Sequence, residues 1–406
     1  MFQTIHTTLE RIQFNGAVYI EKGNNESLHL TLGFADMNDS VPITKNTLFN
    51  IASLSKMYTS VMILQLIEKN LISFEDKLTK WFRTKNFQNV TIKHLLTHTS
   101  GIPEYIDNLS FQEDIEGILY NKEPYFPPGC GWLYTNTNYV LLAKIIEQTS
   151  EYSYEDYLQK MIANPLQLPY TTTKPRSEQL AIGKLFDYIH NKYIPLSEDP
   201  IFKDIDKKYN FYGDGGIYST AKEIAKFLKG FIQGRLVSLE LVKRALTPTP
   251  LNNKYGYGFI IQENSFGHSG GWPGYSSHCL CSLTNETMTI LLTNEEISPF
   301  YEQQILAFLK QSQDSKEPNA PKHPRITLAN NSDHIEGIYQ LSDEYQTRFT
   351  IKRDINFHII SFDDQHNTHL FKVKPDLYWI RNTMSYINMA NGIFIDEGIE
   401  VPFNKQ

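Results

Sequence analysis

The sequence predicts a mixed α/β fold followed by a small β-rich domain, because strand-like runs stand on both sides of a long helical region and resume near the end of the chain. A helical pattern with long loops extends from Ser53 to about Leu246. On either side of it, runs that alternate between apolar and polar residues, or are apolar throughout, predict strands. These runs lie at 16–22, 28–36, 257–261, 278–283 and 288–293.

The domain organisation follows from a change in composition late in the chain. A polar stretch at 313–326 holds three prolines between 318 and 324 and is predicted to be a linker. We therefore expect a first domain over 1–312, which ends with a helix at about 301–311, and a β domain over 327–406. The short alternating runs that predict this second domain lie at 348–352, 357–362, 370–374, 377–381 and 392–395.

The first chemically informative motif is a serine followed three positions later by a lysine, at Ser53 and Lys56. It stands at the start of an apolar run without Gly or Pro that extends to Glu68, which predicts a buried helix. Positions i and i+3 share one face of a helix, so the Lys56 amine can lie beside the Ser53 hydroxyl. A serine becomes a good nucleophile when a neighbouring group removes its proton. The other interpretation is a helix cap followed by a solvated lysine.

The second motif is Tyr134 and Asn136, after a rigid turn at 126–132 and ahead of an apolar helix at about 139–147. A nearby ammonium group favours the phenolate form of a tyrosine, so Tyr134 could carry protons between Ser53 and a leaving group. The amide of Asn136 could orient Lys56 or a substrate carbonyl. An ordinary turn is the competing interpretation.

The third motif is the small-residue segment that comprises His268, Ser269, Gly270 and Gly271. Small residues let a substrate approach the backbone closely. An oxyanion hole requires N–H donors at the position of the developing anion, and the N–H groups of Ser53 and Gly271 are the candidates. A plain glycine-rich hairpin would explain the same residues.

Two of the motifs occur a second time in settings that predict no chemistry. Ser219 and Lys222 read as a helix cap followed by a surface helix. The tyrosine and asparagine of 386–388 lie inside a predicted strand. Only the first copies are therefore taken as site residues.

The three motifs in this order resemble the serine β-lactamase and penicillin-binding-protein superfamily, and specifically its class-C-like branch of β-lactamase-related serine hydrolases. That branch includes D-aminopeptidases, D-Ala-D-Ala carboxypeptidases and esterases. The resemblance covers about residues 5–310. The other stretches that carry it are GFAD at 33–36, TLFNIAS at 47–53, HLLTHTSGIP at 94–103, GDGGIYST at 213–220 and YGYG at 255–258.

The resemblance implies a β-lactamase/transpeptidase-like antiparallel sheet flanked by helices, an all-α lobe, and a C-terminal domain similar to a lipocalin-like half-barrel. It implies Ser53 as nucleophile, Lys56 and Tyr134 as the acid/base pair and Asn136 as an orienting residue, with 268–271 beside the substrate. His268 stands where penicillin-processing members place a lysine. Because histidine is neutral over much of the physiological pH range, this departure argues against an efficient β-lactamase or transpeptidase.

The expected function is hydrolysis of amide bonds in short or D-residue-containing peptides through an acyl-enzyme on Ser53. The alternatives are a carboxylesterase and a catalytically idle scaffold or receptor for peptidoglycan-like ligands. Which of Lys56 and Tyr134 acts as base stays open, because the two should titrate as a coupled pair. The C-terminal domain could shade the site, mediate self-association or only stabilise the chain.

The resemblance implies a small-molecule or short-peptide substrate, and composition gives no sign of a nucleic-acid or membrane partner. The 406 residues carry a net charge of −7 and no basic cluster with interleaved aromatic residues, which excludes a nucleic-acid-binding surface. No apolar run reaches the about 20 residues that span a bilayer. Residues 1–15 show no signal peptide, so the chain as written is expected in the cytoplasm, or outside it if a signal was removed. A homo-oligomer is compatible with all of this.

No cofactor and no metal site are expected. Cys279 and Cys281 are two apart in a predicted strand, which does not suit a zinc site, and with Cys130 they make an odd number of thiols, expected to be reduced. His94 and His98 have the i, i+4 spacing of a helical zinc pair. Leu95 occupies the position where the metalloprotease pattern requires Glu, so a structural helix end is the better interpretation.

Overall fold

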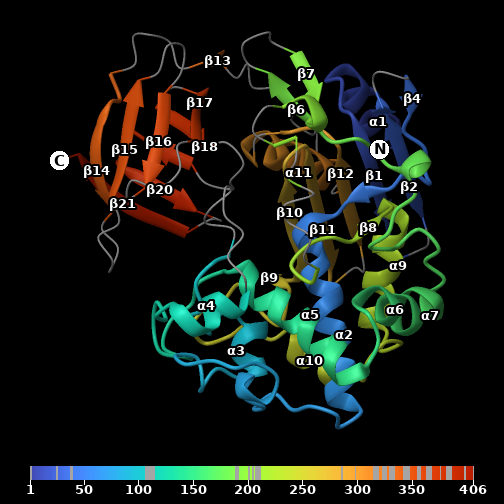
Figure 1. Cartoon of the computed structure of the whole chain (residues 1–406). Helices are drawn as coiled ribbons and strands as arrows, with labels where there is room; N and C mark the ends of the chain where they lie inside the picture. Colours follow the sequence, from blue (N-terminus) through green and yellow to red (C-terminus); the bar gives the residue numbers. More distant parts are fainter. Residues whose placement is uncertain are drawn as a thin grey trace. The chain divides into compact units, whose positions relative to one another are not determined.

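The computed structural model describes most of the chain as helices, strands and ordered loops (Figure 1). The residues outside the description are 1, 24–25, 37–39, 106–114, 188–191, 200–201, 204, 206–211, 285–286, 298, 314–319, 322–326, 329–333, 342–347, 354–357, 363–367, 375, 381–385, 397–398 and 406.

The chain divides into two compact units. The larger one, here called the catalytic unit, comprises Phe14–Leu185 and Tyr193–Glu296. The other, called the C-terminal unit, comprises Met1–Gln13, Phe186–Lys192 and Ile297–Gln406.

The catalytic unit is built on a six-stranded antiparallel sheet with the strand order β2-β1-β12-β11-β10-β9. The N-terminal hairpin therefore pairs with strands from residues 260–293, and β1 joins β12 from Gly16 opposite Thr293 to Glu21 opposite Met288. Every residue of β12 is buried, which explains its uninterrupted apolar sequence. The strands of this sheet are β1 (Gly16–Glu21), β2 (Ser27–Leu32), β9 (Ile260–Gln262), β10 (Ser265–Trp272), β11 (Tyr275–Ser282) and β12 (Met288–Thr293).

The helices of the catalytic unit surround one that is buried on nearly all sides, α2 (Ser55–Glu68). Helix α2 lies against α5 (Asn136–Ser150) in Figure 1, and α9 (Ala221–Ile232) packs on β1 and β12. The Lys229–Glu21 ion pair joins α9 to β1 at 2.6 Å. The other helices are α3 (Ile92–Leu96), α4 (Ile115–Asn121), α6 (Tyr154–Leu158), α7 (Asn164–Leu166) and α10 (Leu239–Ala245), with a π-turn at Gln159–Ala163 and 3-10 turns at Ala52–Leu54, Leu78–Lys80, Ser177–Gln179 and Leu196–Glu198.

Short strand pairs complete the catalytic unit. Strand β5 (Phe49–Asn50), which leads into the Ser53 turn, pairs with β8 (Tyr218–Ser219). The remaining short strands are β3 (Phe34–Asp36), β4 (Val41–Pro42), β6 (Lys184–Asp187) and β7 (Lys192–Pro195), of which β6 and β7 run across the boundary between the units in sequence.

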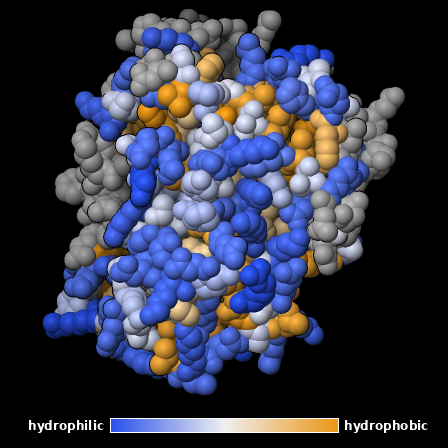
Figure 2. Space-filling view, turned by 90° about the vertical axis from the view of Figure 1, so that its right-hand side faces the viewer, coloured by the Kyte–Doolittle hydropathy of each residue, from blue (hydrophilic) through white to orange (hydrophobic). Residues whose placement is uncertain are grey.

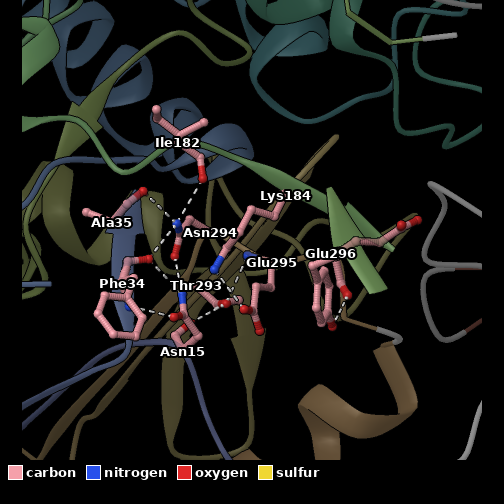
Figure 3. A network of polar contacts seen from close by, with 10 residues as sticks. Asn15, Phe34, Ala35, Ile182, Lys184, Thr293, Asn294, Glu295 and Glu296 are labelled. Carbon is pink, nitrogen blue, oxygen red and sulfur yellow. Dashed lines mark hydrogen bonds and ion pairs between the residues drawn. The ribbon is translucent and has the colours of Figure 1, made fainter. Parts of the chain in front are cut away.

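A buried polar network ties the end of β12 to the start of β1, to strand β3 and to the loop that contains Ile182 (Figure 3). Asn294 is fully buried; its Oδ1 accepts a hydrogen bond from Asn15 Nδ2 at 2.6 Å. Its Nδ2 donates to the main-chain oxygens of Phe34, Ala35 and Ile182. Next to it, buried Lys184 forms an ion pair with Glu295 at 2.8 Å. The side chains of Asn15, Asn294, Lys184 and Glu295 thus find partners inside the protein, as burial requires.

The C-terminal unit contains helices α1 (Phe2–Arg11) and α11 (Pro299–Gln313) and a curled antiparallel sheet. Successive strands from β14 to β21 pair with one another, β21 pairs with β14, and the sheet thereby closes on itself. This is the strand order of an up-and-down barrel, and buried apolar side chains such as Phe349, Ile360 and Tyr378 fill its core. The strands are β13 (Thr327–Leu328), β14 (Gly337–Leu341), β15 (Arg348–Arg353), β16 (His358–Phe362), β17 (Thr368–Lys374), β18 (Leu377–Ile380), β19 (Tyr386–Asn388), β20 (Ile393–Asp396) and β21 (Ile399–Lys405).

The predicted α/β fold with a C-terminal β structure is confirmed, and several boundaries differ from prediction. Helix α2 begins at Ser55, so Ser53 lies in the preceding 3-10 turn. Helix α5 begins at Asn136, three residues before the predicted start. The cap of α9 is Thr220, whose hydroxyl accepts from Glu223 N, and not Ser219. Most of the predicted linker at 313–326 lies outside the described residues.

The surface in Figure 2 is mainly hydrophilic, with apolar residues gathered in separate patches. Among the described residues, none of the helices combines the length and the apolar character needed to cross a membrane.

Candidate active site

Ser53 is presented by a strained turn between β5 and α2. Ala52, directly before it, has a φ of +45°, a conformation that residues with a Cβ rarely adopt. The turn is held by a hydrogen bond from Ala52 N to the side-chain oxygen of Asn50 at 2.9 Å. Strain of this kind persists where the surroundings fix the backbone, and such positions cluster at functional sites.

The same turn is bonded to the loop before β8 and to strand β11, and strand β10 lies directly beside it. Ile51 N donates to Ile217 O at 3.0 Å, and the hydroxyl of Ser277 donates to Ile51 O at 2.8 Å. A Cβ on Gly270 would come within 2.8 Å of both Ile51 O and Ser53 N. Gly270 therefore lets β10 pass directly beside the serine.

Lys56 is fully buried and its amine touches three oxygen atoms. The Nζ atom lies 2.9 Å from Ser53 Oγ, 2.7 Å from Asn136 Oδ1 and 2.9 Å from the main-chain oxygen of Asp214. The carboxyl group of Asp214 is also buried. Burial raises its pKa, and the charge of Lys56 and the hydroxyl of Tyr105 act in the opposite direction.

Asn136 is oriented by a carboxylate that sequence reasoning did not identify. Glu104 Oε2 accepts hydrogen bonds from Asn136 N at 2.6 Å and from Asn136 Nδ2 at 3.1 Å. Since the amide nitrogen faces Glu104, the amide oxygen faces Lys56.

Tyr134 lies beside Lys56 on the segment that enters α5. The lysine amine is 4.8 Å from the centroid of the Tyr134 ring. The ring also stacks at a tilt on His98, with centroids 4.3 Å apart. His98 also fixes this segment, because Leu133 N donates to its main-chain oxygen and Thr135 N to its Nδ1.

His268 stands at one end of a chain of buried, hydrogen-bonded side chains that lies near Tyr134. His98 Nε2 lies 3.2 Å from the hydroxyl oxygen of Tyr255, which lies 3.3 Å from His268 Nε2. At one end Thr135 N can only donate to His98 Nδ1; at the other, His268 Nδ1 must donate to Ser269 O. Because its Nδ1 accepts, His98 donates from Nε2 to the Tyr255 hydroxyl oxygen, and the Tyr255 hydroxyl is free to donate to Nε2 of a neutral His268.

The hydrogen bond that His98 Nδ1 accepts requires His98 to be neutral, and the surroundings of both histidines favour the neutral state. Burial, helped by the positive charge of Lys56, lowers the pKa of His268 to about 3. The same two causes, with His268 as a third, hold the pKa of His98 well below its ordinary value. The group at position 268 is thus an uncharged imidazole over the physiological pH range.

Among the described strands, none pairs with the edge of β10 opposite β11 beyond Gly267. Strand β9 pairs with β10 only from Ser265 to Gly267, whereas β11 pairs with it as far as Trp272. Gly271 is exposed, and a Cβ added there would have no heavy atom within 4 Å. Beyond Gly267 this edge is suited to extended ligands that add backbone hydrogen bonds to a strand.

The structure thus brings Ser53, Lys56, Tyr134 and Asn136 together, with His268 and Gly270 beside them. Sequence reasoning did not identify five residues that support this group through hydrogen bonds: His98, Glu104, Tyr105, Asp214 and Tyr255. His98 and Tyr255 stand in the stretches HLLTHTSGIP and YGYG that carried the family resemblance, which was the one available signal for them. His94 takes part in a capping box with Thr91 at the start of α3. Cys130 is exposed, and Cys279 and Cys281 are buried in β11.

Comparison with known proteins agrees with this geometry. Residues 2–311 match the protein family described as Beta-lactamase. Penicillin-binding protein 4* of Bacillus subtilis is 34% identical over 331 residues, which cover 75% of this chain and 73% of that protein. Teichoic acid D-alanine hydrolase of Staphylococcus aureus is 26% identical over 284 residues, or 67% of this chain and 69% of that protein.

A solved structure extends the likeness of the fold to the whole chain. The octameric penicillin-binding protein homologue from Pyrococcus abyssi has a TM-score of 0.65 and 23% identity, and the match covers 100% of this chain and 95% of that one. The match to the family over 2–311 and the 34% identity to a relative along most of its length lead to one conclusion. The chain belongs to the Beta-lactamase family, a family of serine hydrolases and penicillin-binding-protein-like proteins.

Proposed function

We propose that this protein hydrolyses amide bonds of short or D-residue-containing peptides through an acyl-enzyme on Ser53. The observation that carries the proposal is the contact between the buried amine of Lys56 and the Ser53 hydroxyl at 2.9 Å. In this mechanism the serine attacks the carbonyl carbon, the leaving amine departs with a proton, and water then releases the acyl group.

The partners of Lys56 support its role as the proton acceptor. Two of them, Asn136 Oδ1 and Asp214 O, can only accept, so they use two N–H bonds of the amine in either protonation state. The third position faces Ser53. In the neutral amine this position is the lone pair, which can accept the serine proton; in the ammonium ion it is an N–H that can return a proton.

Tyr134 is proposed as the second member of the acid/base pair, because its ring lies close to both Lys56 and the neutral His98. It would pass the proton to the leaving group. The N–H groups of Ser53 and Gly271 are proposed to hold the oxyanion. The closeness of Gly270 to Ser53 N supports this assignment, since it places the Ser53 turn and strand β10 side by side.

The choice of substrate rests on the neutral His268 and on the relatives. With an uncharged imidazole at 268, the site lacks at this position the cation that would attract a substrate carboxylate. One relative is named for hydrolysis of D-alanine from teichoic acid. Both points favour small D-aminoacyl substrates whose scissile group carries no adjacent carboxylate.

The test is steady-state hydrolysis of matched pairs of D- and L-alanyl p-nitroanilides, D-alanyl esters and D-Ala-D-Ala peptides by the wild type and Ser53→Ala. We expect turnover of the D-alanyl amides that Ser53→Ala lacks. Turnover of the esters alone would support the carboxylesterase instead, which shares the same acyl-enzyme. Absence of turnover of every substrate by both proteins would favour an idle scaffold.

The relative described as octameric supports a further part of the proposal, namely that this chain also self-associates. Sedimentation velocity at several protein concentrations tests it. A single species with the mass of one chain at all concentrations would contradict self-association.

A further inference from the structure

We propose that Glu104 is a positioning residue that holds the Asn136 amide with its oxygen towards Lys56 and so sets the hydrogen bonding of the lysine beside Ser53. This inference deepens the proposed function and rests on it, because it concerns the proton transfer at the same site.

The polarity of the Asn136 amide follows from the charges on its two sides. One carboxylate oxygen of Glu104 accepts both the main-chain and the side-chain N–H of Asn136. If the amide turned over, its oxygen would face the carboxylate, and its NH2 group would face the amine of Lys56 at 2.7 Å. Both contacts would then be unfavourable, acceptor against acceptor and donor against donor. Glu104 therefore selects the one orientation in which Asn136 accepts from the lysine.

The carboxylate of Glu104 is itself held in place. Its other oxygen accepts from Tyr105 N at 2.8 Å, so both oxygens are engaged. The segment before it is fastened to the first turn of α5 by two hydrogen bonds. Ser100 Oγ donates to Asn138 Oδ1 at 2.6 Å, and Thr137 Oγ1 donates to the main-chain oxygen of Pro103 at 2.7 Å. With the bond from Asn136 to Glu104, three successive residues of α5 are tied to one segment.

The neighbouring residue, Tyr105, supports the other acceptor-only partner of Lys56. The buried hydroxyl of Tyr105 donates to Asp214 Oδ2 at 2.8 Å, and the main-chain oxygen of Asp214 accepts from Lys56. Two consecutive residues therefore position two of the three oxygen atoms around the amine. The third oxygen is the nucleophile, so the orientation of the lysine towards Ser53 depends on this pair.

The test compares Glu104→Ala, Glu104→Gln, Asn136→Ala and the double variant Glu104→Ala/Asn136→Ala. The readouts are the rate constant for labelling of Ser53 by a fluorophosphonate probe, and kcat and KM for a substrate of the wild type. Glu123→Ala is the matched control, because Glu123 is an exposed carboxylate that also accepts from an asparagine amide, that of Asn86.

We expect Glu104→Ala to lower the labelling rate and kcat by about 10- to 100-fold, the effect of losing a hydrogen bond to a charged group, with little change in KM. In the Asn136→Ala background the same substitution should have almost no further effect, because Glu104 acts through that amide. Glu104→Gln keeps an oxygen that can accept both N–H groups, so it should retain more activity than Glu104→Ala. Glu123→Ala should match the wild type.

Three results would overturn the inference: an unchanged labelling rate in Glu104→Ala, effects of the two single substitutions that multiply fully in the double variant, or a change confined to KM. The last would mean that Glu104 contacts substrate. If the probe did not label the wild type itself, that result would contradict the proposed function and not only the role of Glu104. A labelled wild type with an unaffected Glu104→Ala would reject the role of Glu104 alone. If Glu104→Ala did not fold, Glu104→Gln and its double variant with Asn136→Ala would decide the question.

Discussion

At the scale of single residues, the chemistry depends on where one buried amine directs its lone pair. Lys56 is surrounded by two oxygens that can only accept and by the hydroxyl of Ser53. A side chain of similar length without the amine should fill the same space and leave the serine unactivated.

We therefore predict that Lys56→Met lowers the rate of Ser53 labelling by about 10²–10⁴-fold, the usual contribution of a general base. The measurement is the rate of fluorophosphonate labelling, followed by intact mass on protein whose fold is checked by circular dichroism. Lys229→Met, which removes a partly exposed lysine of α9 that pairs with Glu21 of β1, is the control and should label like the wild type. Equal rates for the two variants would refute the role of Lys56.

The sequence predicted the residues that stand at fixed spacing in the chain, and did not predict those that are joined by tertiary contacts. Ser53 and Lys56 are neighbours on one turn, so their contact follows from helical geometry. Glu104 and Asn136 are 32 positions apart, and no periodicity predicts their hydrogen bonds. His98 was interpreted only as a helix end, because its bond to Tyr255 depends on a partner 157 positions away.

At the scale of elements, the close passage of β10 beside the Ser53 turn explains why one position of that strand must lack a side chain. A Cβ on Gly270 would lie 2.6 Å from Ser277 Oγ and 2.8 Å from Ser53 N, whereas one on Gly271 would meet nothing within 4 Å.

Gly270→Ala should destabilise the protein by about 1–3 kcal/mol, the usual cost of overpacking, and should slow labelling because the serine turn must move. Gly271→Ala should leave the free energy of unfolding within about 0.5 kcal/mol of the wild type. Urea unfolding of the two variants measures the difference. Equal stabilities would contradict the close approach of β10 to the turn.

Element boundaries were predicted least well where hydrogen bonds to other parts of the chain shift them. The predicted strand at 257–261 is observed only as β9 at Ile260–Gln262. Ahead of it the main chain is engaged elsewhere: Tyr257 N donates to Ala245 O, and Ser60 Oγ donates to Tyr257 O. Gly258, with a φ of +78°, turns the chain between these contacts and the strand. Such contacts cannot be read from alternation of apolar and polar residues.

At the scale of the whole catalytic unit, the network around Asn294 should be a main determinant of stability, because one side chain satisfies three main-chain oxygens and Asn15 (Figure 3). Asn294→Ala should lower the free energy of unfolding by about 3 kcal/mol, since buried groups left without partners cost about 1–3 kcal/mol each and part of the loss is relieved by relaxation. Urea unfolding measures it. Asn89→Ala, at an exposed asparagine that accepts from Lys77, is the control and should change stability by less than about 0.5 kcal/mol.

Stability should also depend on pH through the buried histidines. In the unfolded chain a histidine binds a proton below about pH 6.5, whereas the pKa of folded His268 is about 3. Between these values the unfolded state binds more protons, so stability is full above pH 6.5 and falls as the pH drops. His98 acts in the same direction. Glu302 opposes both, because burial raises its pKa to about 8.

Since several groups contribute to the pH dependence of stability, we predict only the change caused by replacing His268. The slope of unfolding free energy against pH between 5 and 6 should be shallower in His268→Asn by at most about 1.4 kcal/mol per pH unit, the contribution of one proton. Lys56 and Tyr134 are unchanged in His268→Asn, so the difference between the two slopes reports on His268. An unchanged slope would mean that folded His268 titrates as it does in the unfolded chain.

The general arrangement of strands, helices and a C-terminal β structure could be predicted because hydrophobic periodicity survives in a single sequence. The closure of the C-terminal sheet could not, since the pairing of β21 with β14 joins the two ends of that segment and leaves no local pattern.

The central claim is that Ser53 is an activated nucleophile, and intact-protein mass after incubation with a fluorophosphonate probe tests it most directly. The wild type should gain the mass of one phosphonyl group, and Ser53→Ala should gain none. A parallel incubation with a penicillin should give at most slow adduct formation, because His268 is neutral. A folded wild type that forms no adduct with the probe, or a Ser53→Ala variant that is labelled equally, would contradict the account.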